Sequence, residues 1–64
     1  MHTDARFQLA GDLAVQIVSD IQAKGVRVVL HVGLAEPKSH EILVTPPVAR
    51  AIASALISGA AEIR

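Results

Sequence analysis

Apolar positions in the first third of the chain follow a helical spacing. Between residues 3 and 24 the apolar side chains fall on one face of a helix and the polar side chains on the other. Thr3 is a suitable N-cap, and Gly25 is a suitable stop after Lys24. This pattern predicts a helix over residues 3–24. The apolar face would hold Phe7, Ala10, Ala14, Ile17, Val18 and Ile21, and the polar face Gln8, Asp12, Gln16, Ser19 and Asp20.

The same segment also has the pattern of a strand. Leu13, Val15 and Ile17 recur at the two-residue period of an extended chain, and the sequence Ala-Lys-Gly at 23–25 provides a turn. Residues 5–22 are therefore compatible with a helix or with strands. The helix is the first prediction, and strands are the alternative.

Two later runs, 26–32 and 40–45, are rich in β-branched residues and predict strands. The loop 33–39 between them contains glycine, proline and serine, so the two strands are expected to form an antiparallel hairpin. Matching of the faces sets Val32 opposite His40, and this register gives one aliphatic face. The other face would hold Arg27, Val29, His31, Glu41, Leu43 and Thr45.

The last segment predicts a helix over residues 46–63. Thr45 is expected to cap it, with Pro46 at the first helical position, where a missing N–H costs little. A helical wheel gives two apolar stripes, so the helix carries more apolar surface than one neighbouring layer covers. The large stripe holds Val48, Ala49, Ile52, Leu56, Ala60 and Ile63, and the small stripe holds Ala51, Ala55 and Gly59.

These elements predict one α+β domain over residues 1–64 with the order α-β-β-α, in which a two-stranded hairpin packs on two helices. A chain of 64 residues buries only about 60% of its unfolded surface, and this one has no cysteine to form disulfides. A two-stranded sheet is seldom stable alone. We therefore expect a homo-oligomer, a dimer or higher, in which the sheet is extended. The expected interface residues are Val29, Leu43, Ala51, Ala55 and Gly59.

The charge pattern does not favour nucleic acid or membrane as a partner. Six basic and six acidic residues cancel, no run of like charge occurs, and Phe7 is the only aromatic residue for base stacking. The N-terminal residues lack the basic and apolar regions of a signal peptide, and no apolar segment reaches the length of a membrane span. We expect a soluble, cytoplasmic protein.

Few residues could carry chemistry. His31 and Glu41 are expected to face each other across the hairpin, while His40 points to the other face, so no metal site is expected. No motif for a nucleophile, a phosphate loop or a zinc protease occurs. We therefore expect no enzymatic activity and no cofactor. A small polar ligand, if one binds, would be held by Arg27, His31, Lys38, Glu41, Thr45 and Arg50.

Residues 40–63 resemble the strand and "LTPxxARxLAxALxxAA" tail of small uncharacterised proteins from actinobacteria and their phages. The resemblance implies no activity, but it suggests a phage-type accessory protein. The matching residues are Val44, Thr45, Pro46, Ala49, Arg50, Ile52, Ala53, Ala55, Leu56, Ala60 and Ala61.

Three functions remain open. The first is a homo-oligomeric binding module, for example an inhibitor of host defence that sequesters a nucleotide-like ligand or occludes a protein partner. The second is a small DNA-binding regulator or antitoxin-like protein. The third is a subunit of a metal-dependent enzyme.

Overall fold

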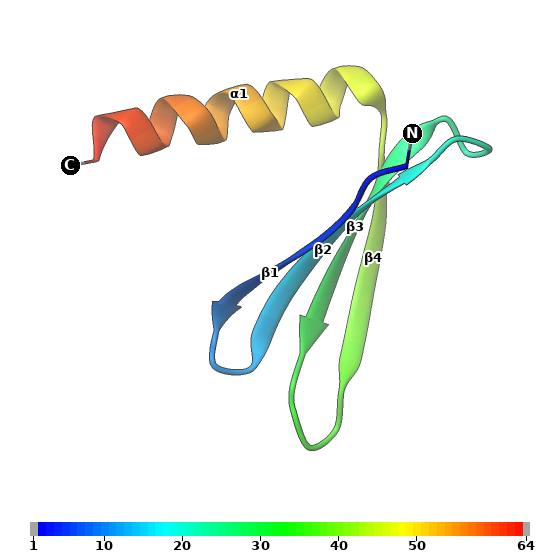
Figure 1. Cartoon of the computed structure of the whole chain (residues 1–64), viewed down its shortest axis with the longest axis vertical. Coiled ribbons are helices and arrows are strands. Elements are labelled where there is room, and N and C mark those ends of the chain that lie inside the picture. Colours follow the sequence, from blue (N-terminus) through cyan, green and yellow to red (C-terminus); the bar gives the residue numbers. More distant parts are fainter. Residues whose placement is uncertain (1, 64) are drawn as a thin grey trace.

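The computed structural model describes residues 2–63 as four strands followed by one helix (Figure 1). The strands are neighbours in chain order and form a single antiparallel sheet, β1-β2-β3-β4. The expected α-β-β-α order is therefore wrong, because two strands stand where the helix over residues 3–24 was predicted. The elements are β1 (Asp4–Ala10), β2 (Leu13–Asp20), β3 (Gly25–Val32), β4 (Lys38–Val44) and α1 (Pro46–Glu62).

Residues 4–20 form strands because β3 can then be paired on both sides. β2 pairs with β3 along its whole length, so that Val15 lies opposite Leu30 and Ile17 opposite Val28. This pairing satisfies the backbone of both strands and places their apolar side chains on one face of the sheet. A helix through the same residues would have had Gly11 in its interior, at a cost of about 1 kcal/mol. The alternative strand reading of this segment is the correct one.

The connection between β2 and β3 is a turn fixed by a side chain. The Asp20 carboxylate accepts a hydrogen bond from the backbone N–H of Ala23 at 3.0 Å, and the Lys24 N–H donates to the Ile21 carbonyl at 3.2 Å. Lys24 adopts a left-handed backbone with φ of 55°. Lys24 and Gly25, expected to end a helix, therefore reverse the chain and begin β3.

The hairpin of β3 and β4 forms as predicted, but in another register. Leu30 lies opposite His40 and Val28 opposite Ile42, which is two residues away from the expected pairing. A shift of two residues leaves every side chain on its predicted face, whereas a shift of one would have exchanged the faces. The loop begins at Gly33 as expected, with a φ of 91°, but it is two residues shorter because Lys38 and Ser39 already belong to β4.

Helix α1 is confirmed within one residue of its predicted end, but Thr45 does not cap it with its side chain. Thr45 occupies the N-cap position with an extended backbone, and its hydroxyl makes no capping hydrogen bond. One of the two amides that such a hydroxyl bonds is missing, because Pro47 occupies the second helical position. The backbone hydrogen bond from Ala49 to the Thr45 carbonyl, at 2.9 Å, starts the helix instead. Among residues 2–63 we find no helix with the length and hydropathy needed to cross a bilayer.

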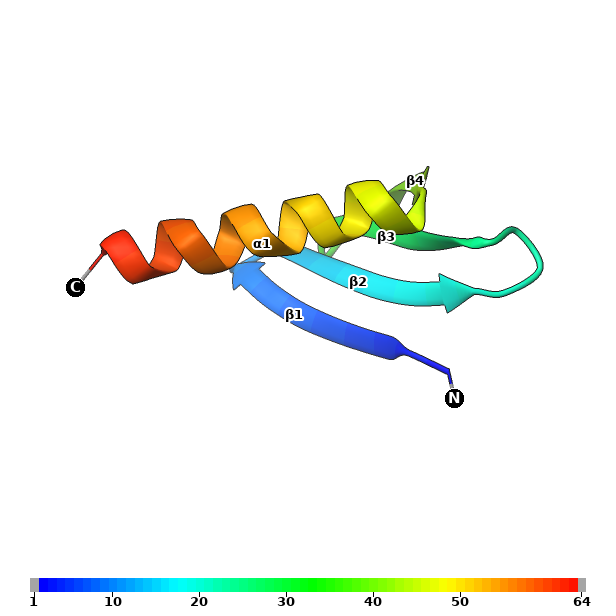
Figure 2. The same cartoon turned by 90° about the horizontal axis from the view of Figure 1, so that it is seen from above.

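The helix rises away from the sheet, so the two elements enclose a wedge. α1 leaves the end of β4, crosses above the sheet and extends past it on the side of β1 (Figures 1 and 2). The Cα radius of gyration is 13.2 Å, against about 11 Å for a compact domain of this length. Within the described residues only Ala14, at 3% exposure, is a buried hydrophobic residue. The fold therefore has two apolar layers that hardly meet.

Candidate functional site

The four-stranded sheet has one polar and one apolar face, and the polar face carries the chemistry. We define the polar face by the side chains that alternate onto the side of the sheet away from α1. The register places them in rows across the strands, so that residues far apart in sequence become neighbours. The polar face contains Asp4, Arg6, Gln8, Gln16, Val18, Asp20, Arg27, Val29, His31, Ser39, Glu41 and Leu43.

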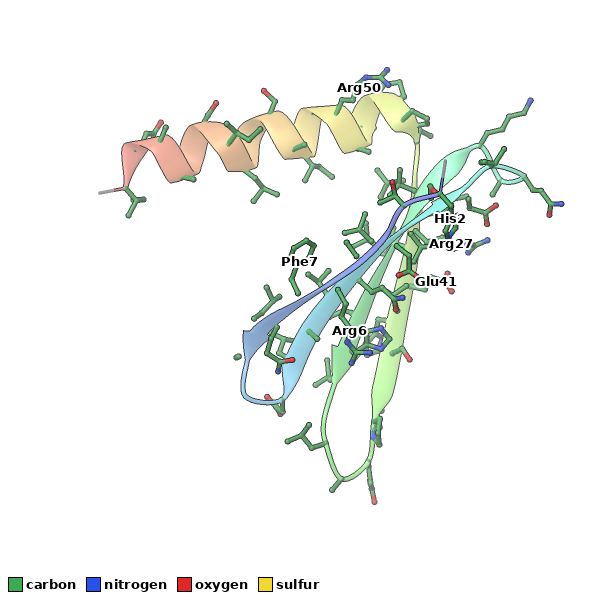
Figure 3. All side chains as sticks on the ribbon, viewed as in Figure 1. His2, Arg6, Phe7, Arg27, Glu41 and Arg50 are labelled. Atoms are coloured by element: carbon green, nitrogen blue, oxygen red, sulfur yellow. The ribbon has the colours of Figure 1, made fainter. Side chains whose placement is uncertain are left out.

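Arg27 lies at the centre of an ion-pair cluster on this face (Figure 3). Its Nε donates to Asp20 Oδ2 at 2.7 Å, and its Nη1 donates to Glu41 Oε1 at 2.9 Å. The three side chains come from β2, β3 and β4, so the cluster links adjacent strands. Two carboxylates surround one guanidinium, and the cluster as a whole carries a negative charge.

The cluster shifts the ionisation of its members. The pKa of Asp20 is lowered, first by the hydrogen bond from the Ala23 amide and then by the hydrogen bond from Arg27. The pKa of Arg27 is raised, first by its hydrogen bond to Asp20 and then by the one to Glu41. Both shifts favour the charged forms, so Asp20 and Arg27 stay ionised at neutral pH.

A second set of hydrogen bonds runs across β1, β2 and β3. The Gln16 amide donates to Asp4 Oδ1 at 2.8 Å, and Gln16 Oε1 lies 2.9 Å from His31 Nε2. Because Gln16 directs its NH₂ at a carboxylate, its oxygen faces the imidazole, and His31 Nε2 must be the donor. The row thus holds the His31 ring on the polar face through Nε2.

The structure brings together only part of the expected ligand set. Arg27, His31 and Glu41 share the polar face, although His31 bonds Gln16 and lies opposite Ser39 rather than Glu41. Lys38 alternates onto the other face at the far end of β4. Arg50 lies on the upper side of α1, away from the sheet (Figure 3), and Thr45 joins β4 to α1. One chain therefore does not assemble these six residues into a pocket.

Three members of the polar face were missed as site residues: Asp4, Gln16 and Asp20. Gln16 and Asp20 had been assigned to the polar face of the predicted helix and Asp4 to its first turn, where they would not have met Arg27 or His31. The two-residue spacing of Gln16, Val18 and Asp20 could have placed them on one face of a strand, and this was the available signal in the sequence.

The expected interface residues fall in two places. Val29 and Leu43 lie on the polar face, as predicted for that side of the hairpin. The small stripe of Ala51, Ala55 and Gly59 is exposed, and a Cβ added at Gly59 meets nothing within 4 Å. The helix expected over residues 3–24, which could have packed on this stripe, does not exist, because two strands occupy that segment.

The described residues show no metal centre. No three His, Asp or Glu side chains between residues 2 and 63 lie close enough to hold an ion. His40 lies opposite Leu30 on the apolar face, away from His31. His2 Nδ1 lies 3.4 Å from Ser19 Oγ, but that hydroxyl already accepts the Thr3 amide at 2.9 Å and ties the chain start to β2.

The apolar face lies under α1 and is only partly covered. A cavity of 220 Å³ lies where the first half of the helix meets the end of the sheet nearest Thr45. Ala49, Ile52 and Leu56 of the large stripe contribute to it, so this part of the stripe faces the sheet as predicted. Its other lining residues are Ala53 of α1 and, from the sheet, Ile17, Val26, Val28 and Val44.

The chain's own geometry is the basis for any functional assignment. Comparisons of this chain with protein-family models, with curated proteins and with solved structures found no match.

Proposed function

We propose that this protein is a small, non-enzymatic binding module that works as a homo-oligomer. The observation that carries the proposal is the uncovered apolar surface. The chain exposes 5239 Å², whereas a folded monomer of 6.7 kDa exposes about 3,900 Å². The excess of about 1,300 Å² exceeds the roughly 800 Å² that each partner contributes to a standard interface. Association would remove this surface from water.

The apolar layer is the part of the molecule suited to association. Phe7 is 54% exposed, although it points into the wedge between sheet and helix (Figure 3). Leu56 is 68% exposed, although it lines the cavity under the helix. Burial of apolar surface contributes about 25 cal/mol per Å², so an open wedge of this kind forgoes much of the stabilisation that a small domain needs. A second copy supplies the missing cover.

The polar face is then left outward as the binding surface. It offers donors and acceptors held by hydrogen bonds, with Val18, Val29 and Leu43 between them. This combination suits a ligand or protein surface that has both polar groups and apolar patches. A preformed set of side chains also lowers the entropy that binding must overcome.

The electrostatics limit the ligand. Arg27 is already neutralised by Asp20 and Glu41, so it is a poor site for a bare anion within one chain. Sequestration of a nucleotide-like ligand by a phage-type inhibitor therefore requires cations from more than one copy, for example Lys38 or Arg50 of a neighbour. Without such convergence, a protein partner is the better candidate.

Sedimentation velocity and native mass spectrometry at micromolar concentration test the proposal. We expect a dimer or higher oligomer, and a folded monomer would contradict it. Arg27→Ala and His31→Ala then test the polar face, because a binding role predicts loss of partner affinity with the oligomer intact. Ser58→Ala, on the outer side of the helix, is the matched control for a surface truncation away from that face.

A further inference from the structure

The apolar face is arranged in rows, and α1 covers only the rows nearest its own start. The covered rows contain Val26 opposite Val44, and Ile17 opposite Val28. These four residues line the cavity under the helix. The next row, in which Phe7 and Leu30 flank Val15, does not line that cavity and lies farther from Thr45. The far half of the apolar face thus has no cover from its own helix.

The far half of α1 likewise lacks an apolar surface to pack against. The large stripe continues past Leu56 through Ala60 to Ile63, which is 78% exposed. The helix of 17 residues is about 26 Å long, and its last turns extend past the sheet (Figures 1 and 2). An apolar stripe therefore continues where its own chain provides no apolar surface beneath it.

We propose that the occupant is a second copy of this chain, and that the two copies exchange helix ends. The last two turns of α1 of one copy lie over the row of Phe7, Val15 and Leu30 of the other, and the reverse contact forms by symmetry. This arrangement rests on the proposed homo-oligomer and specifies its interface. Each helix end covers the open sheet row of the other copy, so both uncovered surfaces of each chain become buried.

Three observations favour a second copy over a different protein. The excess surface of about 1,300 Å² per chain, or about 2,600 Å² for two copies, lies in the range that obligate homodimers bury. Each chain leaves open both a helix stripe, ending at Ile63, and a sheet row that contains Phe7, as a self-complementary contact requires. The charges at this contact are also complementary. The row that would receive the helix end includes His40, and the next row includes Lys38. The helix end carries Glu62 and the negative end of the helix dipole.

Engineered cysteines test the exchange, since the chain has none of its own. One chain carries Ala60→Cys on the large stripe, and a tagged chain carries Val15→Cys on the uncovered row. The two are unfolded together, refolded as an equimolar mixture and oxidised. Each chain has one thiol, so a bond between positions 60 and 15 can form only between copies. Ser58→Cys, on the outer side of the same helix turn, replaces Ala60→Cys in the control.

We expect the 60–15 pair to crosslink at least about tenfold more than the 58–15 pair, because a disulfide needs Cβ atoms about 4 Å apart. An oligomer that shows no such preference overturns the exchange and leaves the homo-oligomer standing. A folded monomer overturns both. As a second measurement, Ile63→Ser should raise the dimer Kd at least about tenfold, as expected for one buried aliphatic side chain. An unchanged Kd counts against the exchange.

Discussion

The two faces of the sheet differ in how fully one chain satisfies them: the side chains of the polar face find hydrogen-bond partners, whereas much of the apolar face stays exposed. On the polar face, Arg27, Asp20 and Glu41 satisfy one another, and Gln16 links Asp4 to His31. On the apolar face, the helix covers one end and leaves the other open. Hydrogen bonds are short-range and local, so four strands in register are enough to form them. Apolar burial needs a second layer over the whole face, and a single 17-residue helix set at an angle does not supply it.

This difference suggests that the polar face forms when one chain folds, whereas the apolar face is completed only when chains associate. The polar face is completed by hydrogen bonds within one chain. The apolar face determines whether the sheet is stable enough to persist, because small domains depend on apolar burial for most of their stability. The molecule is expected to be marginal when diluted and stable when associated.

Two adjacent valines give the sharpest test of this comparison. Val28 lies on the apolar face and Val29 on the polar face, opposite Glu41. Val28→Asn should cost about 2 to 4 kcal/mol of unfolding free energy, because the amide is placed in the layer to be buried. Val29→Asn should change it by less than about 1 kcal/mol, since hydrogen-bonding partners are present there. Chemical denaturation at a fixed protein concentration measures both.

Equal effects of these two substitutions would contradict the comparison. If both were harmless, the apolar face would be exposed to water in the functional state, and the homo-oligomer would lose its main support. If both were severe, the polar face would be buried in the assembly as well.

Gly25 tests how tightly the side chains pack at the edge of the polar face. A Cβ at Gly25 would lie 2.9 Å from the Val44 carbonyl oxygen and 3.0 Å from the Leu43 side chain, whereas a Cβ at Gly11 meets nothing within 4 Å. Gly25→Ala should therefore destabilise the fold by about 1 to 3 kcal/mol through overpacking. Gly11→Ala is the matched control and should stay within about 1 kcal/mol of the wild type. Thermal melts followed by circular dichroism would compare them, and a Gly25→Ala variant as stable as the control would refute the tight contact.

The smallest expected effect is in acid. The pKa of Asp20 is lower in the folded chain than in the unfolded one, so the unfolded state binds more protons at intermediate pH. The resulting stabilisation is present above the unfolded pKa and disappears as pH falls through the folded pKa. The melting temperature of the wild type should therefore decline between about pH 5 and pH 2. Asp20→Asn should flatten this decline, and an unchanged pH profile in that variant would show that other carboxylates are responsible.

The sequence predicted the second half of the molecule better than the first. For α1, the proline pair at its start and the stripe through Ile52 and Leu56 left little ambiguity. For residues 4–20, Ala10, Ala14 and Val18 satisfy a helical and an extended period equally, and alanine carries little weight in either. The decision came from β3, whose free edge pairs with β2, and such a long-range partner is not visible in a local pattern.

The polar face was predictable only where the hairpin was. The side of the sheet on which Arg27 and Glu41 meet followed from alternation, and this survived a two-residue error in register. Asp20 could not be assigned to Arg27 while it was placed on a helix. The register error came from the loop, because Lys38 and Ser39, expected in the loop, pair with Val32 and His31 as part of β4.

The joint between β4 and α1 has a consequence for the rate and strength of assembly. Proline fixes φ at Pro46 and Pro47, and it restricts Thr45 to the extended backbone that the structure shows, with φ of −66° and ψ of 152°. The joint is therefore stiff, and the angle between α1 and the sheet is set before a second molecule binds. A rigid joint loses little conformational entropy on docking, so more of the apolar contact energy remains as affinity. A flexible joint at the same place would let the helix fold back on its own sheet and compete with the partner.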